Sequence, residues 1–425
     1  MKDFRIHIIE LGPIKDAEIR LAPFMIFTGK SSLGKSYVNF LSYYVFDLFG
    51  NNGLSRFLKT KIEGKQWNNQ QLSFGFSIGE MKMWMAEDAT SFLRDLLAFP
   101  KLECNVEFLF DISGDESISI VVTDKGSLNK DDIENGLREI RVEIVGYNVL
   151  SLLSFNDLQY TISSAVTSIL SKEILGELVF SAFLLPPGRT SLINNSFSVK
   201  KMASNTGMYD RFLHDYDSLQ NSGLRFLQQK EDNQFFVSQI KRLIHGDVIT
   251  EKDETYLLLD NGKPIPVSAA ASSIRELSPL LFWIKNRNVD RSSICLEEPE
   301  AHAHPEMQFG IAELLATCLN KGAFMQITTH SDYLLTRINQ LIRLYKFQKN
   351  HPKEFENSSF VRNKRQTINP QDVKAYYFEF SKEVGHVIVH EQKLEDGIPF
   401  DSFRNVIVQQ MEFNDELTKY LDNDN

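Results

Sequence analysis

Hydrophobic and polar positions follow two different periods along this chain. Residues 4–9 and 17–21 alternate and 24–27 form an apolar run, so we expect three short strands before a glycine-rich turn and a helix ending near Leu48. After residue 270, helical periodicity alternates with short apolar runs. This predicts an α/β fold with a parallel sheet and crossover helices. The predicted elements are helix 273–286, strand 293–297, helix 306–320, strand 323–328 and helix 332–347.

The middle of the chain has a mixed pattern, and after residue 370 a small β element precedes a last helix. The sheet is therefore expected to form from the two ends of the chain, with the middle inserted. The elements predicted for the middle are helix 78–98, a hairpin of strands 106–112 and 117–122, strand 140–145, helix 156–174, strand 179–185, polar helices over 200–250 and a hairpin over 254–268 turning at Asn261-Gly262.

Composition narrows the class of protein. Of 425 residues, 42% are hydrophobic and 24% charged, which excludes wholesale disorder. The net charge of −10 excludes a broadly basic surface but leaves room for a local basic groove. The three cysteines lack the spacing of a zinc site or a disulfide framework. The chain start shows no signal peptide and no apolar stretch is long enough for a bilayer, so we expect a cytoplasmic protein without a membrane partner.

The sharpest motif is a glycine-rich loop between a predicted strand and a predicted helix, which fits the pattern G-x-x-x-x-G-K-[ST]. Such a loop surrounds a β-phosphate with backbone N–H groups, while Lys35 reaches the β- and γ-phosphates and the Ser36 hydroxyl binds Mg²⁺. The alternative is an ordinary glycine turn. The residues expected to bind ATP here are Gly29, Lys30, Ser31, Ser32, Leu33, Gly34, Lys35, Ser36 and Tyr37.

A second motif is the segment 293–300, an apolar strand that ends in two consecutive carboxylates. The carboxyl edge of an open α/β sheet is where such folds bind ligands. A site that hydrolyses nucleotide needs one carboxylate near Mg²⁺ and another that orients and deprotonates water. We assign Glu297 to the metal and Glu298 to the water. The alternative is a pair of solvated glutamates in an acidic loop.

The segment 324–331 is another predicted strand that runs into a histidine, His330. It should reach the same edge of the sheet, where a neutral imidazole could touch the γ-phosphate and the attacking water. A structural histidine is the alternative. Arg189 is also ambiguous, since it could contact a phosphate or a partner, or form a structural salt bridge.

The phosphate loop, the Glu-Glu-Pro-Glu-Ala-His-Ala-His-Pro segment at 297–305 and the Thr-Thr-His-Ser segment at 328–331 resemble ABC-type ATPases of the RecF/SMC/OLD group. More narrowly, the chain is similar to compact AAA-type ATPases of bacterial anti-phage systems such as Septu and PARIS. The resemblance implies a P-loop ABC-type ATPase head with a mixed sheet, an N-terminal antiparallel β layer and helical insertions. The expected units are head segments 1–50, 178–204 and 251–345, a mixed α/β insertion 51–177, a helical insert 205–250 and a C-terminal extension 346–425.

The same resemblance implies a head-to-head homodimer, or a higher homo-oligomer, in which a signature serine of one chain caps ATP held by the other. The matching residues are Ser272 and Ser273, although Ile274 stands where a glycine is expected. A plain helix N-cap is the alternative, because a serine hydroxyl can accept a hydrogen bond from the first turn. The resemblance also places His302 and His304 in a loop that crosses the dimer interface.

The function expected on these grounds is that of a Mg²⁺-dependent ATPase that controls a separately encoded effector, such as a nuclease, in anti-phage defence. Three alternatives stay open: a DNA-repair ATPase of the RecF type, an OLD-like ATPase-nuclease, and a slow ATP-binding sensor. Small basic clusters at 200–201 and 362–365 keep nucleic-acid binding open as well.

Overall fold

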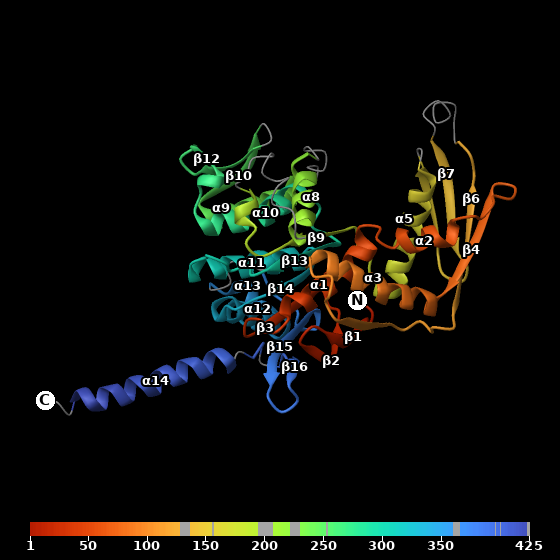
Figure 1. Ribbon diagram of the computed structural model, residues 1–425. Coiled ribbons are helices and arrows are strands. Elements are labelled where there is room, and N and C mark those ends of the chain that lie inside the picture. The colour runs from red at the N-terminus through yellow and green to blue at the C-terminus, as the bar shows by residue number, and fades with distance from the viewer. Residues whose placement is uncertain are drawn as a thin grey trace.

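A nine-stranded mixed sheet forms the centre of the molecule (Figure 1). The computed structural model describes residues 1–127, 137–154, 157–193, 207–221, 230–251, 254–359, 366–395, 397–399 and 401–422. The strand order of the sheet is β5-β1-β2-β16-β15-β3-β14-β13-β9. In chain order these strands are β1 (Arg5–Leu11), β2 (Ile14–Arg20), β3 (Phe24–Gly29), β5 (Cys104–Leu109), β9 (Ser181–Leu185), β13 (Ser292–Glu297), β14 (Phe324–Thr328), β15 (Val373–Ser381) and β16 (His386–Glu391).

Segments from both ends of the chain lie side by side in this sheet. Strand β3 runs parallel to β14 on one side and to β15 on the other. Strands β13 and β9 continue the parallel part, whereas β1 pairs antiparallel with β2 and β5. Strand β16 joins the two parts, since it pairs antiparallel with β15 and parallel with β2. The predicted α/β fold with a mixed sheet and an N-terminal antiparallel layer is confirmed.

The parallel strands are buried on both faces, as parallel sheets require. Met25 and Phe27 of β3 pack into the core on one face, with helix α1 (Lys35–Gly50), and Phe24 and Ile26 pack into the core on the other. Alternating side chains therefore serve two cores at once, and α1 is held directly against the strand that precedes the glycine-rich loop. The helices of the second face are α10 (Ser272–Asn286), α11 (Pro305–Asn320) and α12 (Asp332–Asn350).

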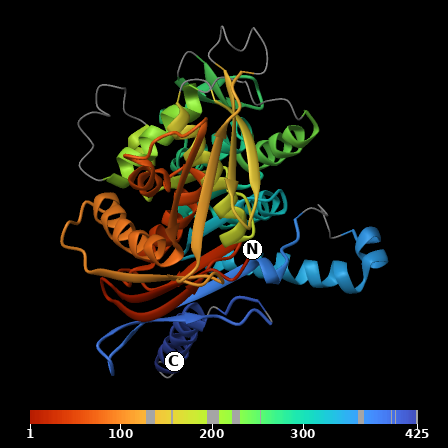
Figure 2. The same ribbon diagram turned by 90° about the vertical axis from the view of Figure 1, so that its right-hand side faces the viewer.

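Much of the range 51–177 forms a lobe beside the large sheet, seen on the right of Figure 1 and facing the viewer in Figure 2, whereas β5 of this range belongs to the large sheet itself. The lobe's four-stranded sheet has the order β4-β6-β7-β8. The predicted hairpin of strands 106–112 and 117–122 is wrong, because β5 pairs with β1 of the large sheet while β6 pairs with β4 and β7. The lobe's elements are α2 (Ser55–Ile62), β4 (Gln71–Ser77), α3 (Ile78–Leu96), β6 (Ser117–Asp124), β7 (Arg138–Ile144), β8 (Val149–Ser154) and α5 (Leu158–Leu175).

The remaining elements lie around the second face of the large sheet and at the carboxyl end. The predicted turn at Asn261-Gly262 is confirmed, since the Gly262 N–H donates to the Leu259 carbonyl between two paired strands. Helix α14 extends away from the rest of the molecule (Figure 1). Both predicted basic clusters lie outside the described residues. These elements are α6 (Thr190–Ile193), α8 (Gly207–Asn221), α9 (Lys230–Ile244), β10 (Gly246–Glu251), β11 (Glu254–Leu259), β12 (Pro264–Pro266), η1 (Val267–Ala269), α13 (Pro352–Asn357), η2 (Pro370–Asp372) and α14 (Asp401–Asp422).

Candidate active site

The glycine-rich loop connects β3 to α1 and depends on two glycines. Gly29 and Gly34 have φ angles of 133° and 87°, in the region that glycine tolerates best. A Cβ atom at Gly29 would lie 2.5 Å from the Phe378 carbonyl oxygen, and one at Gly34 would lie 2.9 Å from Ile14 Cδ1. The loop thus fits closely between its neighbouring strands. Because α1 begins at Lys35, its unpaired N-terminal N–H groups lie next to the loop and favour an anion there.

Lys35 and Ser36 connect the loop to the acidic strand end. The Lys35 ammonium donates to the Lys30 carbonyl at 2.7 Å. Burial lowers the pKa of Lys35, and the charges of Glu297 and Glu298 oppose that shift. The Ser36 hydroxyl donates to Glu297 Oε2 at 2.6 Å, across 261 positions of sequence. The end of β13 and the start of α1 therefore meet directly.

Glu297 is buried and accepts a hydrogen bond on each carboxylate oxygen. Besides the Ser36 hydroxyl on Oε2, the Asn39 amide donates to Oε1 at 2.5 Å. Burial raises the pKa of Glu297, while the hydrogen bonds from Ser36, Asn39 and Thr328 counteract the rise. A carboxylate and a hydroxyl are hard oxygen donors of the kind that Mg²⁺ takes. The residues present therefore fit a magnesium site.

Glu298 and His330 lie on neighbouring strand ends beside this pair. Glu298 has a φ of 47°, and its N–H donates to the Thr328 carbonyl at 3.2 Å. Burial lowers the pKa of His330, and Lys35 lowers it further against the opposing charge of Glu298. The lowered pKa favours the neutral imidazole near pH 7, in which one ring nitrogen donates a hydrogen bond and the other accepts one.

These side chains share one open cleft of about 370 Å³. The cleft is lined by most of the predicted loop residues, and also by Glu297, Glu298 and His330. The loop residues that do not line it are Gly29, Lys30 and Leu33. A polar cleft with a lysine, hydroxyl groups and two carboxylates suits a highly charged ligand with its cation. The residues that line it are Pro13, Ser31, Ser32, Gly34, Lys35, Ser36, Tyr37, Glu297, Glu298, Thr328 and His330.

Ser272 and Ser273 occupy the first turn of α10 and do not line this cleft. The alternative of a serine N-cap is wrong, because Ala271 is the N-cap residue and no side chain caps the helix. The Ser272 hydroxyl instead accepts a hydrogen bond from Arg275 at 3.1 Å. Neither serine therefore caps the helix that it begins.

Arg189 proves to be a structural residue. It is fully buried and donates to the backbone carbonyls of Glu276 at 2.8 Å, Pro186 at 3.0 Å and Glu297 at 3.0 Å. Its guanidinium also lies 3.3 Å from the Glu276 carboxylate. Direct contact with a phosphate is excluded by this burial. Instead, Arg189 joins α10 to the end of the acidic strand.

Sequence reasoning missed some residues that shape the site. Asn39 follows Ser36 by three positions in α1, and this helical spacing could have shown that both face Glu297. Glu300, Thr328 and Thr329 connect the loops after β13 and β14, a contact that no local pattern reveals. His302 and His304 are exposed, and His304 is the N-cap residue of α11.

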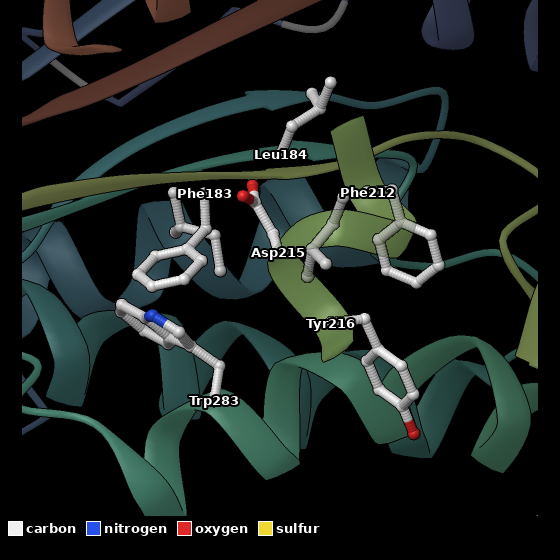
Figure 3. Close-up of a pocket in the computed structure, with 8 residues that line it drawn as sticks. Phe183, Leu184, Phe212, Asp215, Tyr216 and Trp283 are labelled. Carbon is white, nitrogen blue, oxygen red and sulfur yellow. The ribbon is translucent and has the colours of Figure 1, made fainter. Parts of the chain in front are cut away.

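A second and much smaller cavity lies between β9, α8 and α10 (Figure 3). It measures about 10 Å³, and its one charged group is Asp215, whose carboxylate points from α8 toward the strand carrying Phe183 and Leu184 (Figure 3). Asp215 Oδ2 is buried without a hydrogen-bond partner. The lining residues are Phe183, Leu184, Leu185, Phe212, Asp215, Tyr216, Trp283 and Ile294.

The described part of the chain holds no group of three or more His, Cys, Asp or Glu residues arranged to bind a metal ion. No helix among the described residues has the length and apolar character needed to cross a membrane.

Comparison with known proteins gives one family match. A family model described as an AAA ATPase domain matches residues 191–335, which include the acidic strand end and His330 but not the glycine-rich loop. No curated protein matches the chain. The fold seen here, a mixed sheet with the glycine-rich loop before α1, is that of a P-loop ATPase, and residues 191–335 are similar to an AAA ATPase domain.

Several solved structures match over most of the chain at low identity. An Smc head bound to the C-terminal winged-helix domain of ScpA has 10% identity and a TM-score of 0.40, covering 93% of this chain and 98% of its own. An SMC head domain from Thermotoga maritima has 8% identity and a TM-score of 0.34, covering 92% and 100%. An Smc head with an extended coiled coil, bound to the C-terminal domain of ScpA derived from Pyrococcus furiosus, has 12% identity and a TM-score of 0.38, covering 96% and 98%.

Proposed function

We propose that this protein binds ATP with Mg²⁺ in the open cleft and hydrolyses it. The observation that carries the proposal is the 2.6 Å hydrogen bond between Ser36 and Glu297. It joins a phosphate-type loop to an acidic strand end at the edge where α/β folds bind ligands. The match of residues 191–335 to an AAA ATPase domain supports the same activity.

Each residue has a role in this proposal. The N-terminus of α1 and Lys35 hold the phosphates, and Ser36 and Glu297 hold Mg²⁺, which would neutralise charge on the phosphate oxygens. Glu298 takes a proton from the attacking water, and neutral His330, which lines the same cleft, orients that water and the γ-phosphate. Asn39 keeps Glu297 oriented toward Ser36.

The proposal includes a homodimer, or a higher homo-oligomer, that closes around ATP. It is supported by the position of Ser272 and Ser273, which do not line the cleft of their own chain but start a helix whose N-terminus favours an anion. In the dimer these serines would cap nucleotide held by the partner chain.

Mixing two defective variants tests this arrangement. Lys35→Ala and the double variant Ser272→Ala with Ser273→Ala should each be inactive as homodimers. A 1:1 mixture should regain about a quarter of normal turnover, since half the dimers then hold one intact site under two-fold symmetry. A mixture no faster than the average of its components would contradict the shared site.

The cellular role proposed here is control of a separately encoded effector, such as a nuclease, in anti-phage defence. The support is the resemblance of the three motifs to ATPases of such systems. The test is purification of the native operon products with and without Mg²⁺-ATP, where an effector should co-purify in a nucleotide-dependent way. The purified chain alone should hydrolyse ATP without cutting DNA or RNA.

Two other results would redirect the proposal. Nuclease activity that survives stringent purification and disappears with a point change in this chain would favour the OLD-like alternative. Turnover stimulated by DNA alone, and falling steeply with salt because phosphate contacts release counterions, would favour the RecF-type alternative.

A further inference from the structure

Glu300 connects the acidic loop to the loop that carries His330. It lies two residues after Glu298, and its Oε1 accepts two hydrogen bonds from the neighbouring strand end. The Thr329 hydroxyl donates at 2.8 Å and the His330 N–H donates at 2.7 Å. One carboxylate oxygen thus holds the backbone of the residue whose side chain lines the cleft.

The same contacts extend to the following residue. The Thr329 hydroxyl, besides donating to Glu300, accepts a hydrogen bond from the Ser331 N–H at 3.0 Å. Nearer the strand ends, the Glu298 N–H donates to the Thr328 carbonyl at 3.2 Å. The loops after β13 and β14 are therefore bonded at two points, and a shift of one must move the other.

Stability alone does not explain a carboxylate at this position. Glu300 Oε2 is buried and has no hydrogen-bond partner, and burial raises the pKa of Glu300 against the bonds from His330 and Thr329. An unpartnered buried oxygen costs free energy. A residue that supplied packing alone would avoid this cost, so the use of Glu300 lies in what Oε1 holds.

We propose that Glu300 is a positioning residue that fixes the His330 ring relative to Glu298 and the γ-phosphate. The inference rests on the proposed ATPase function. Glu300 does not line the cleft and touches no reacting atom, so it acts through the backbone of His330 and the hydroxyl of Thr329. Its loss should impair turnover more than ATP binding.

Steady-state kinetics of four variants separate positioning from packing. Glu300→Ala should lower kcat about 10-fold or more and leave KM within about twofold, because displacing the group that orients the water costs rate rather than substrate binding. Glu300→Gln should stay within about threefold of wild type, since its amide oxygen can accept both bonds. Thr329→Val should behave like a weaker Glu300→Ala, and Thr329→Ser should be near normal.

A double-mutant cycle with His330→Ala shows whether Glu300 acts through His330. Adding Glu300→Ala to His330→Ala should then cause little further loss of kcat. Full additivity of the two losses would overturn the inference, and so would equal losses in the Gln and Ala variants.

A second readout does not need turnover. In nucleotide-free protein with isotope-labelled histidine rings, the His330 signal is assigned by its disappearance in His330→Ala. This signal should shift or broaden in Glu300→Ala and stay in place in Glu300→Gln. If it does so in a protein without turnover, the proposed function fails and the positioning role stands; an unmoved signal overturns the role itself.

Discussion

Glu297 and Asp215 are two largely buried carboxylates, and they differ in what surrounds them. Glu297 accepts a hydrogen bond on each oxygen and borders an open cleft of about 370 Å³. Asp215 borders a small cavity of about 10 Å³, leaves one oxygen without a hydrogen-bond partner, and lies 3.8 Å from the guanidinium of Arg211. The first carboxylate faces space for a ligand, and the second faces space for about one water molecule.

The difference shows that a buried acid alone does not mark an active site. Arg211 also pairs with Asp47 in the last part of α1, so the Asp215 cluster connects α8 to the far end of the helix that follows the loop. The charged groups of this cluster pair with one another, since Arg211 lies between Asp47 and Asp215. At the cleft, Lys35 and the hydroxyls of the loop are instead directed toward a space that an ionic ligand can enter. We therefore propose a catalytic role for the first region and a structural role for the second.

The largest expected effect is on turnover, and it contrasts Glu298, a second acid of the open cleft, with Asp215. Glu298→Gln keeps the size of the side chain but removes the base, so ATP should stay bound and turnover should fall at least ~100-fold, about 2.7 kcal/mol of activation free energy. Asp215→Asn should leave turnover within about twofold. Steady-state ATPase assays of both variants check this. Near-normal turnover in Glu298→Gln would move the role of base to Glu297 or His330.

The next effect concerns stability. Arg211→Leu leaves Asp47 and Asp215 as buried carboxylates without their shared cation, and should lower the free energy of unfolding by about 2 kcal/mol. Denaturant unfolding measures this, with Arg141→Leu as a control that breaks only the exposed pair with Glu143. Equal losses in the two variants would contradict a structural role for the buried cluster.

The smallest effect is a pH dependence of that stability. Burial, with the charge of Asp47, raises the pKa of Asp215 to about 6 against Arg211 and His214. The folded value exceeds the unfolded one, near 4, so Asp215 favours the folded state less as pH rises from 4 to 6. Asp215→Asn lacks this loss. Its stability relative to wild type should therefore increase by about 1 to 2 kcal/mol between pH 4.5 and pH 7.5, and a constant difference would refute the raised pKa.

Local patterns were enough to predict the parts that are continuous in sequence. The loop at 29–36 and the acidic strand end at 293–298 were recognised because each needs only neighbouring residues. The parallel part of the sheet followed from the alternation of helices and strands after residue 270, and the mixed sheet from the resemblance to ABC-type ATPases. Strand pairing did not follow, because the alternation over 106–112 and 117–122 identifies strands but not their partners.

Contacts between distant segments set the rest of the site and could not be predicted. The tail after residue 370 was expected to be a small β element, yet β15 lies in the middle of the large sheet, and Phe378 closes over Gly29. From the sequence, Arg189 could equally contact a phosphate or a partner, or form a structural salt bridge. Its burial favours the structural role. The pairing of Arg211 with Asp47 spans 164 positions, and only the packing of α8 on the body brings them together.

The most direct test is a titration of Mg²⁺-ATP against Lys35→Ala, with Lys30→Ala as the matched control. Both lysines lie in the loop, but only the Lys35 side chain lines the cleft, whereas the Lys30 side chain is exposed and its carbonyl accepts from Lys35. Calorimetry should show ATP binding lost in Lys35→Ala, with an unchanged thermal unfolding midpoint, and near-normal binding in Lys30→Ala. Unchanged ATP affinity in Lys35→Ala would contradict the assignment of this cleft as the nucleotide site.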